Sequence, residues 1–143
     1  VEHREALYRA LVVPVLAVLG IGVIGAVAAW LLGPWILSVF FKPDLYVPGG
    51  LLAVLTFASA CTGSLMVTGA ATLASELHKA YVVGWVVASV VAFGVLWLAP
   101  LSLEAGVSVA LIAGPVVGGL VHAAALRGAR AGGGAEMTDH GKM

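Results

Sequence analysis

The run "ALVVPVLAVLGIGVIGAVAAWLL", residues 10–32, decides the class of this protein, because its 23 residues include no charged side chain. At about 1.5 Å per residue, a helix of this length reaches roughly 34 Å, which is enough to cross a bilayer core of about 30 Å. A strand of a membrane barrel would instead alternate apolar and polar residues over about ten positions. The run therefore predicts a membrane-spanning helix.

Three more runs of similar character follow, at residues 50–74, 80–99 and 105–126. The whole chain is 62% hydrophobic and 10% charged, with a mean hydropathy of +1.10, whereas soluble domains carry about 25% charged residues. We therefore predict an all-α integral membrane protein with four transmembrane helices within residues 1–126. Residues 127–143 are Gly-rich and polar, and we expect them to form a disordered cytoplasmic tail.

The basic residues are distributed unequally between the two sides that four spans define. Only Lys42 falls on one side, in the first connector. The other side holds the remaining six of the seven: Arg4, Arg9, Lys79, Arg127, Arg130 and Lys142. Because cytoplasmic segments collect Lys and Arg, both ends are predicted to be cytoplasmic, in a multi-pass protein of the bacterial inner membrane.

The first connector, "GPWILSVFFKPDLYVPGG" at residues 33–50, is rich in aromatic side chains. Trp35 and Tyr46 are residue types that settle at the lipid headgroups, so we interpret them as interfacial anchors. Gly33 and Pro34 are expected to stop or kink the first helix, with "PWILSVFF" as a short helical turn at the interface. Lys42 and Asp44 would then flank the solvated tip of the connector.

Within the spans, small and hydroxyl residues offer two interpretations. Thr56, Ser59 and Gly63 follow the three- and four-residue spacing of one helix face. Such a stripe either permits close helix packing, which is the favoured interpretation, or lines a hydrated cavity. Pro14 and Pro115 interrupt the hydrogen bonding of their helices and predict bends.

No pattern of residues indicates catalysis, a cofactor or a metal, and we expect the chain not to be an enzyme. Net charge is zero, so no basic field attracts nucleic acid. Cys61 is expected to be a small buried residue, and His122 to reach the headgroups, with a proton relay as the alternative. No Asp, Glu, Lys or Arg lies in the core of a span, which argues against a small four-helix multidrug exporter, because proton-coupled carriers need an ionisable group in the membrane.

The segment "GPWILSVFFKPDLYVPGGLLAVL" resembles a span-loop-span signature near the C-terminus of polysaccharide flippases, the O-antigen and teichoic-acid exporters of the multidrug/oligosaccharidyl-lipid/polysaccharide superfamily. The later segments "TGAATLASELHKAYVVGWVVASVVAF" and "LEAGVSVALIAGPVVGGLVHAAAL" are similar to the junction and final span that follow in that family. Lys42 stands where the family usually has glycine. The positions that carry the resemblance are Ile36, Leu37, Phe40, Phe41 and Tyr46.

This resemblance implies a two-lobe transporter of twelve or more helices, of which the chain is a C-terminal fragment; the start at Val1 without a signal peptide favours a fragment too. It implies alternating access and a lipid-linked oligosaccharide or polysaccharide precursor as substrate. The partners would be membrane lipids and the remaining helices of the parent transporter. Two alternatives stay open: a free-standing four-helix membrane module without transport activity, and a drug/cation antiporter of the same superfamily.

Overall fold

The computed structural model describes residues 2–41 and 46–139, with side chains at 9–41 and 46–129. These residues form four helices and no strand: α1 (Glu2–Phe40), α2 (Gly49–Ala74), α3 (His78–Leu98) and α4 (Leu103–Asp139). Each contains a segment long and apolar enough to cross a membrane, at Arg9–Phe40, Gly49–Ala74, His78–Leu98 and Leu103–Ala129. The predicted all-helical class with four spanning-length helices is therefore confirmed.

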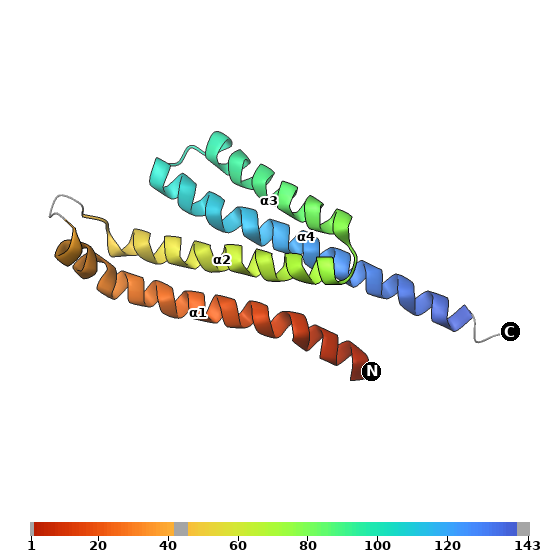
Figure 1. Ribbon diagram of the computed structural model, residues 1–143. Coiled ribbons are helices and arrows are strands. Elements are labelled where there is room, and N and C mark those ends of the chain that lie inside the picture. The colour runs from red at the N-terminus through yellow and green to blue at the C-terminus, as the bar shows by residue number, and fades with distance from the viewer. Residues whose placement is uncertain (1, 42–45, 140–143) are drawn as a thin grey trace.

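The four helices form two antiparallel hairpins that lie side by side (Figure 1). The first hairpin pairs α1 with α2, the second pairs α3 with α4, and the two hairpins meet chiefly where α2 packs on α4. Within the described residues α1 contacts α2 and no other helix. The order across the molecule is therefore α1, α2, α4, α3, and α1 and α4 flank α2 without touching each other.

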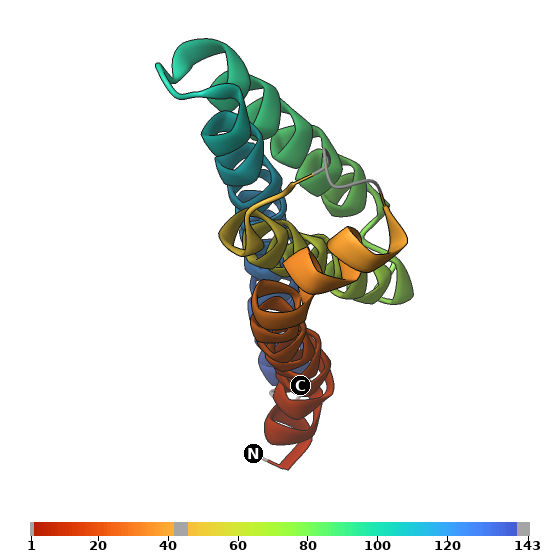
Figure 2. The same cartoon turned by 90° about the vertical axis from the view of Figure 1, so that its left-hand side faces the viewer.

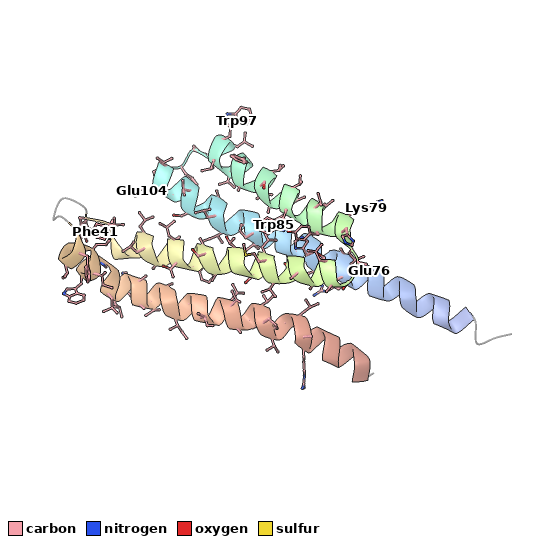
Figure 3. All side chains as sticks on the ribbon, in the orientation of Figure 1. Phe41, Glu76, Lys79, Trp85, Trp97 and Glu104 are labelled. Atoms are coloured by element: carbon pink, nitrogen blue, oxygen red, sulfur yellow. The ribbon has the colours of Figure 1, made fainter. Side chains whose placement is uncertain are left out.

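The helices alternate in direction, as four successive spans require. Phe41, Trp97 and Glu104 lie at one end of the molecule, and Glu76 and Lys79 lie at the opposite end (Figure 3). Both ends of the chain lie on the Glu76 side (Figure 1). The side that the basic residues mark as cytoplasmic is thus the side of both ends and of the α2–α3 turn.

The α2–α3 turn is a tight helix cap built on a residue other than glycine. Glu76 has φ of 60°, in the left-handed region that glycine usually occupies after a helix. Its N–H donates to the Leu73 carbonyl at 3.0 Å, and the Leu77 N–H donates to the Thr72 carbonyl at 2.8 Å, which is the Schellman pattern. The His78 ring donates from Nδ1 to the Glu76 carbonyl at 3.0 Å. This pattern joins two long helices through three residues.

Of the two outcomes expected at Gly33 and Pro34, a stop or a kink of the helix, the structure shows the kink. α1 runs past residue 32 and continues through Pro34 to Phe40, and Figure 2 shows its last turns at an angle to the rest of α1. Proline at this position leaves the Trp30 carbonyl without its helical donor, so the helix bends there. Gly49 lies directly against that carbonyl, where a Cβ would collide with it. The tip residues Lys42 and Asp44 lie outside the described residues.

The C-terminal segment differs from the prediction. The structure continues α4 to Asp139, where the sequence predicts a disordered tail at residues 127–143. Extending an existing helix costs far less free energy than starting one, and alanine and arginine between residues 123 and 131 favour the helix. Residues 140–143 lie outside the described part of the chain.

Small residues bring α3 and α4 into close contact. Gly114 and Gly118 of α4 face Gly84 and Ala88 of α3, and a Cβ built on Gly118 would lie 2.7 Å from the Gly84 carbonyl oxygen. A Cβ on Gly114 would likewise lie 2.7 Å from the Ala88 carbonyl oxygen. Four-residue spacing of small side chains on both helices allows this approach.

Candidate functional site

A groove of about 360 Å³ lies between α1, α2 and α4. It exists because α1 and α4 flank α2 without meeting, so that α2 forms its floor. Its lining comes from α1 between Leu11 and Leu19, from α2 between Cys61 and Thr68, and from α4 between Pro115 and Arg127. Its volume is within the usual range for a small-molecule site.

The lining of the groove is almost wholly apolar, with one cationic side chain, Arg127, at one end. The polar members are Ser64, Thr68 and Arg127, and the Ser64 hydroxyl is occupied by a bond to the Ala60 carbonyl at 3.0 Å. Arg127 is exposed and is the last α4 residue of the lining, at the end where both ends of the chain lie. Arg9, also exposed, begins the membrane-length part of α1 at that same end. The groove therefore matches an amphiphile with an apolar chain and an anionic head.

His122 occupies a fully enclosed position beside this groove, with 0% of its surface exposed. Its Nε2 lies 3.1 Å from the Tyr81 carbonyl oxygen, and its Nδ1 lies 3.2 Å from Oγ1 of Thr68. The imidazole and the Tyr81 ring are parallel, with centroids 6.1 Å apart. The ring therefore joins α4 to α3 through Tyr81 and to α2 through Thr68.

Two glycines form the slot that holds this ring. A Cβ at Gly84 would collide with the imidazole, and one at Gly69 would come within 3.4 Å of its Cε1. The expectation that His122 reaches the headgroups is thus wrong, because its ring points into the junction of three helices. The sequence held a signal for this: His122 follows Gly114 and Gly118 at four-residue spacing, which puts all three on one helix face.

The predicted cavity stripe lies on another part of α2. Gly63 faces Val18 of α1, where a Cβ built on Gly63 would meet Cγ1 at 3.2 Å. Thr56 faces Gly25 of α1, where a Cβ built on Gly25 would meet Cγ2 of Thr56 at 3.3 Å. Ser59 is exposed and bonds to the carbonyl one turn earlier at 3.0 Å. None of the three predicted residues lines the groove. Two of them pack against α1, which is the favoured alternative of the sequence analysis.

The remaining predicted residues are spread over the molecule. Cys61 is buried, as expected, and its side chain lines the groove. Pro115 lines the groove too, and Pro14 lies inside α1, whose helix continues on both sides. The proposed anchors Trp35 and Tyr46 are 63% and 75% exposed, so both rings are free to contact lipid headgroups.

Among the described residues, no group of three or more His, Cys, Asp or Glu side chains could bind a metal ion. The buried indole Nε1 of Trp85 has no hydrogen-bond partner among the described atoms, and Trp85 stacks edge-to-face on Tyr81, with centroids 6.3 Å apart. The groove and the His122 slot are therefore the two candidate sites.

Two curated mycobacterial proteins resemble the chain in sequence. The uncharacterized protein Rv1510 of Mycobacterium tuberculosis (strain ATCC 25618 / H37Rv) is 48% identical over 126 residues. The uncharacterized protein Mb3654 of Mycobacterium bovis is 45% identical over 126 residues. Each match covers 88% of this chain and 29% of the relative, so the chain spans less than a third of the length of these relatives. No protein-family profile and no solved structure matches it.

Proposed function

We propose that this chain is part of a flippase that moves lipid-linked oligosaccharide or polysaccharide precursors across the bacterial inner membrane by alternating access. The observation that carries the proposal is the groove between α1, α2 and α4, with aliphatic walls and Arg127 at one end. Four helices of spanning length place such a groove within a bilayer. The family resemblance described above supplies the substrate class.

The occupant that we assign to the groove is the polyprenyl chain of the lipid-linked saccharide. Its hydrocarbon would pack against the aliphatic walls through van der Waals contacts, since lipid tails are as apolar as these side chains and the chain is not transferred from water. The phosphate would lie beside Arg127, since guanidinium groups bind phosphate through paired hydrogen bonds. A single basic residue near a membrane surface contributes about 1 kcal/mol to the binding of an anion.

The length of the relatives leaves room for the further helices that this proposal requires. Their matched region is 29% of their length, so they are more than three times longer than the match. That length accommodates further helices of a two-lobe transporter, which we propose as the partners of the four described here. They would cover apolar side chains that are now exposed, such as Trp97 at 89% and Leu98 at 80%.

Blocking the groove is expected to abolish most lipid binding. Leu120 lines the groove and is 63% exposed, so Leu120→Trp places an indole where the polyprenyl chain would lie. We expect photo-crosslinking of the full chain to a diazirine-labelled polyprenyl pyrophosphate saccharide to fall about tenfold, which is about 1.4 kcal/mol. Arg127→Gln is expected to lower it about fivefold, by the loss of one cation. Flipping in proteoliposomes, followed by dithionite quenching of a fluorescent analogue, should fall in parallel.

Leu111→Trp is the matched control, because Leu111 lies on the same helix, is 42% exposed and does not line the groove. Crosslinking should keep its wild-type yield in this variant. Equal losses at Leu111 and Leu120, or no loss at Leu120, would contradict the assignment. Crosslinking without flipping would indicate a membrane module that binds lipid but transports nothing. Transport of a cationic dye in place of the lipid would indicate the antiporter.

The orientation in the membrane has its own test. Cys61 is the sole cysteine, so Cys61→Ala provides a background for single-cysteine labelling of Glu76→Cys and Glu104→Cys, which lie at opposite ends (Figure 3). With cytoplasmic ends, an impermeant maleimide should label position 104 in intact cells and position 76 after permeabilisation. The reverse order would overturn the proposed orientation.

A further inference from the structure

The groove between α1, α2 and α4 has a limited length. Its α4 wall runs from Pro115 to Arg127, which at about 1.5 Å per helical residue is roughly 18 Å. Its α1 wall, from Leu11 to Leu19, is roughly 12 Å long by the same measure. The bilayer core is about 30 Å thick, so the groove covers only part of the membrane, on the side where Arg127 lies.

The walls end where the helices turn to other contacts. Among the described residues of α1, none beyond Leu19 lines the groove, and three residues further on Gly22 is buried against Ala60 of α2. On α4 the lining ends at Pro115, and the adjacent Gly114 faces α3. At this depth α1 and α4 therefore stop lining the groove and contact neighbouring helices instead.

We propose that the groove binds about the first four isoprene units of the polyprenyl chain, counted from the phosphate, and leaves the rest of the chain in the bilayer. The inference rests on the proposed function, because it takes the polyprenyl lipid as the occupant and places its phosphate beside Arg127. By the dimensions of an extended chain, an isoprene unit, with four bonds along the chain, spans roughly 4.5 Å. About four such units fit along the roughly 18 Å of the α4 wall.

Two residues of α4 mark positions along this length. Leu120 is seven residues from Arg127, or roughly 10 Å, and Val116 is eleven residues from it, or roughly 16 Å. Both side chains line the groove and are partly exposed, Leu120 at 63% and Val116 at 46%. Leu120 therefore lies beside the third isoprene unit, and Val116 lies beside the fourth.

The distal units gain little from leaving the lipid, because lipid tails are as apolar as the side chains of a membrane helix. The first units differ, since three helices surround them and the phosphate at Arg127 holds them in place. We therefore expect this protein to discriminate between lipids that differ close to the phosphate, and to accept changes in the distal part of the chain.

The test is photo-crosslinking of the full chain in lipid nanodiscs with three polyprenyl pyrophosphate disaccharides, which carry a diazirine on the second, fourth or eighth isoprene unit. Only labelling that excess unlabelled compound displaces is counted, and mass spectrometry locates it on α1 and α4. We expect the second and fourth units to label the groove, and the eighth to label it about tenfold less, because it lies roughly four units beyond the walls. Equal labelling from the eighth unit would overturn the length limit and leave the lipid in the groove.

Val116→Trp tests the length separately from the occupancy of the groove. An indole there fills the far end, so labelling from the fourth unit should fall about tenfold, or about 1.4 kcal/mol, while the second unit keeps its wild-type yield. Leu120→Trp should lower both yields, and Leu111→Trp, outside the groove, should lower neither. Equal losses from both units in Val116→Trp would overturn the assigned position of the fourth unit. Groove labelling that is absent from all three compounds, or that excess compound fails to displace, would contradict the proposed function itself and this inference with it.

Discussion

Gly118→Ala is expected to push α4 away from α3 and destabilise the folded protein, whereas Gly119→Ala is expected to leave the fold intact. A Cβ on Gly118 would lie 2.7 Å from the Gly84 carbonyl oxygen and 2.8 Å from Cβ of Ala88. Neither atom can move without its helix. A Cβ on Gly119 would meet only Oγ1 of Thr68, at 3.8 Å, which is ordinary contact.

The two variants gain the same helix propensity, about 1 kcal/mol for alanine over glycine, so their difference reports the contact itself. Overpacking of this kind costs about 1–3 kcal/mol. Tryptophan fluorescence during SDS titration of the protein in micelles would measure it, since Trp85 and Trp97 both lie on α3. Equal stability of the two variants would show that α3 and α4 do not pack as described.

The four helices were predictable because the bilayer imposes both a length and a composition on each span. The ends of the helices were harder to predict from composition than the spans themselves. Gly33 and Pro34 were expected to stop or kink α1, and composition could not decide between the two. The helix bends and continues, with Gly49 packed against the freed Trp30 carbonyl at the bend. The described part of the C-terminal tail is helical because α4 is already nucleated when the chain reaches Arg127.

The groove was not predictable, because it depends on the order in which the helices lie side by side. Apolar residues surround each helix, so no residue pattern on α1 or α4 shows that they flank α2 without meeting. The stripe Thr56, Ser59 and Gly63 was visible in the sequence, but its spacing could not show which helix it faces. His122 was a different case. Its four-residue spacing from Gly118 indicated a buried face, although nothing in the sequence identified Thr68 and Tyr81 as its partners.

Gly22→Ala is expected to detach α1 from α2, whereas Gly20→Ala should have no such effect. Gly22 is buried, and a Cβ there would collide with Cβ of Ala60, a short side chain that cannot move aside. Carbon atoms pack at about 3.5–4.0 Å, so the helices must separate. A Cβ on Gly20 would meet nothing within 4 Å. Stability in SDS titration should fall by about 1–3 kcal/mol for Gly22→Ala alone.

Gly22→Ala is expected to impair lipid binding as well as stability. Among the described residues, α2 is the sole helix that contacts α1. When α1 moves, the wall formed by Leu11 to Leu19 moves with it, so the groove opens along its length. Spin labels at Ile24 and Val54 should report a longer distance by double electron–electron resonance in Gly22→Ala, and lipid crosslinking should fall together with it. An equal increase in Gly20→Ala, or no change in Gly22→Ala, would contradict the described α1–α2 contact. It would also contradict the groove to which we assign the lipid, because α1 forms one wall of that groove.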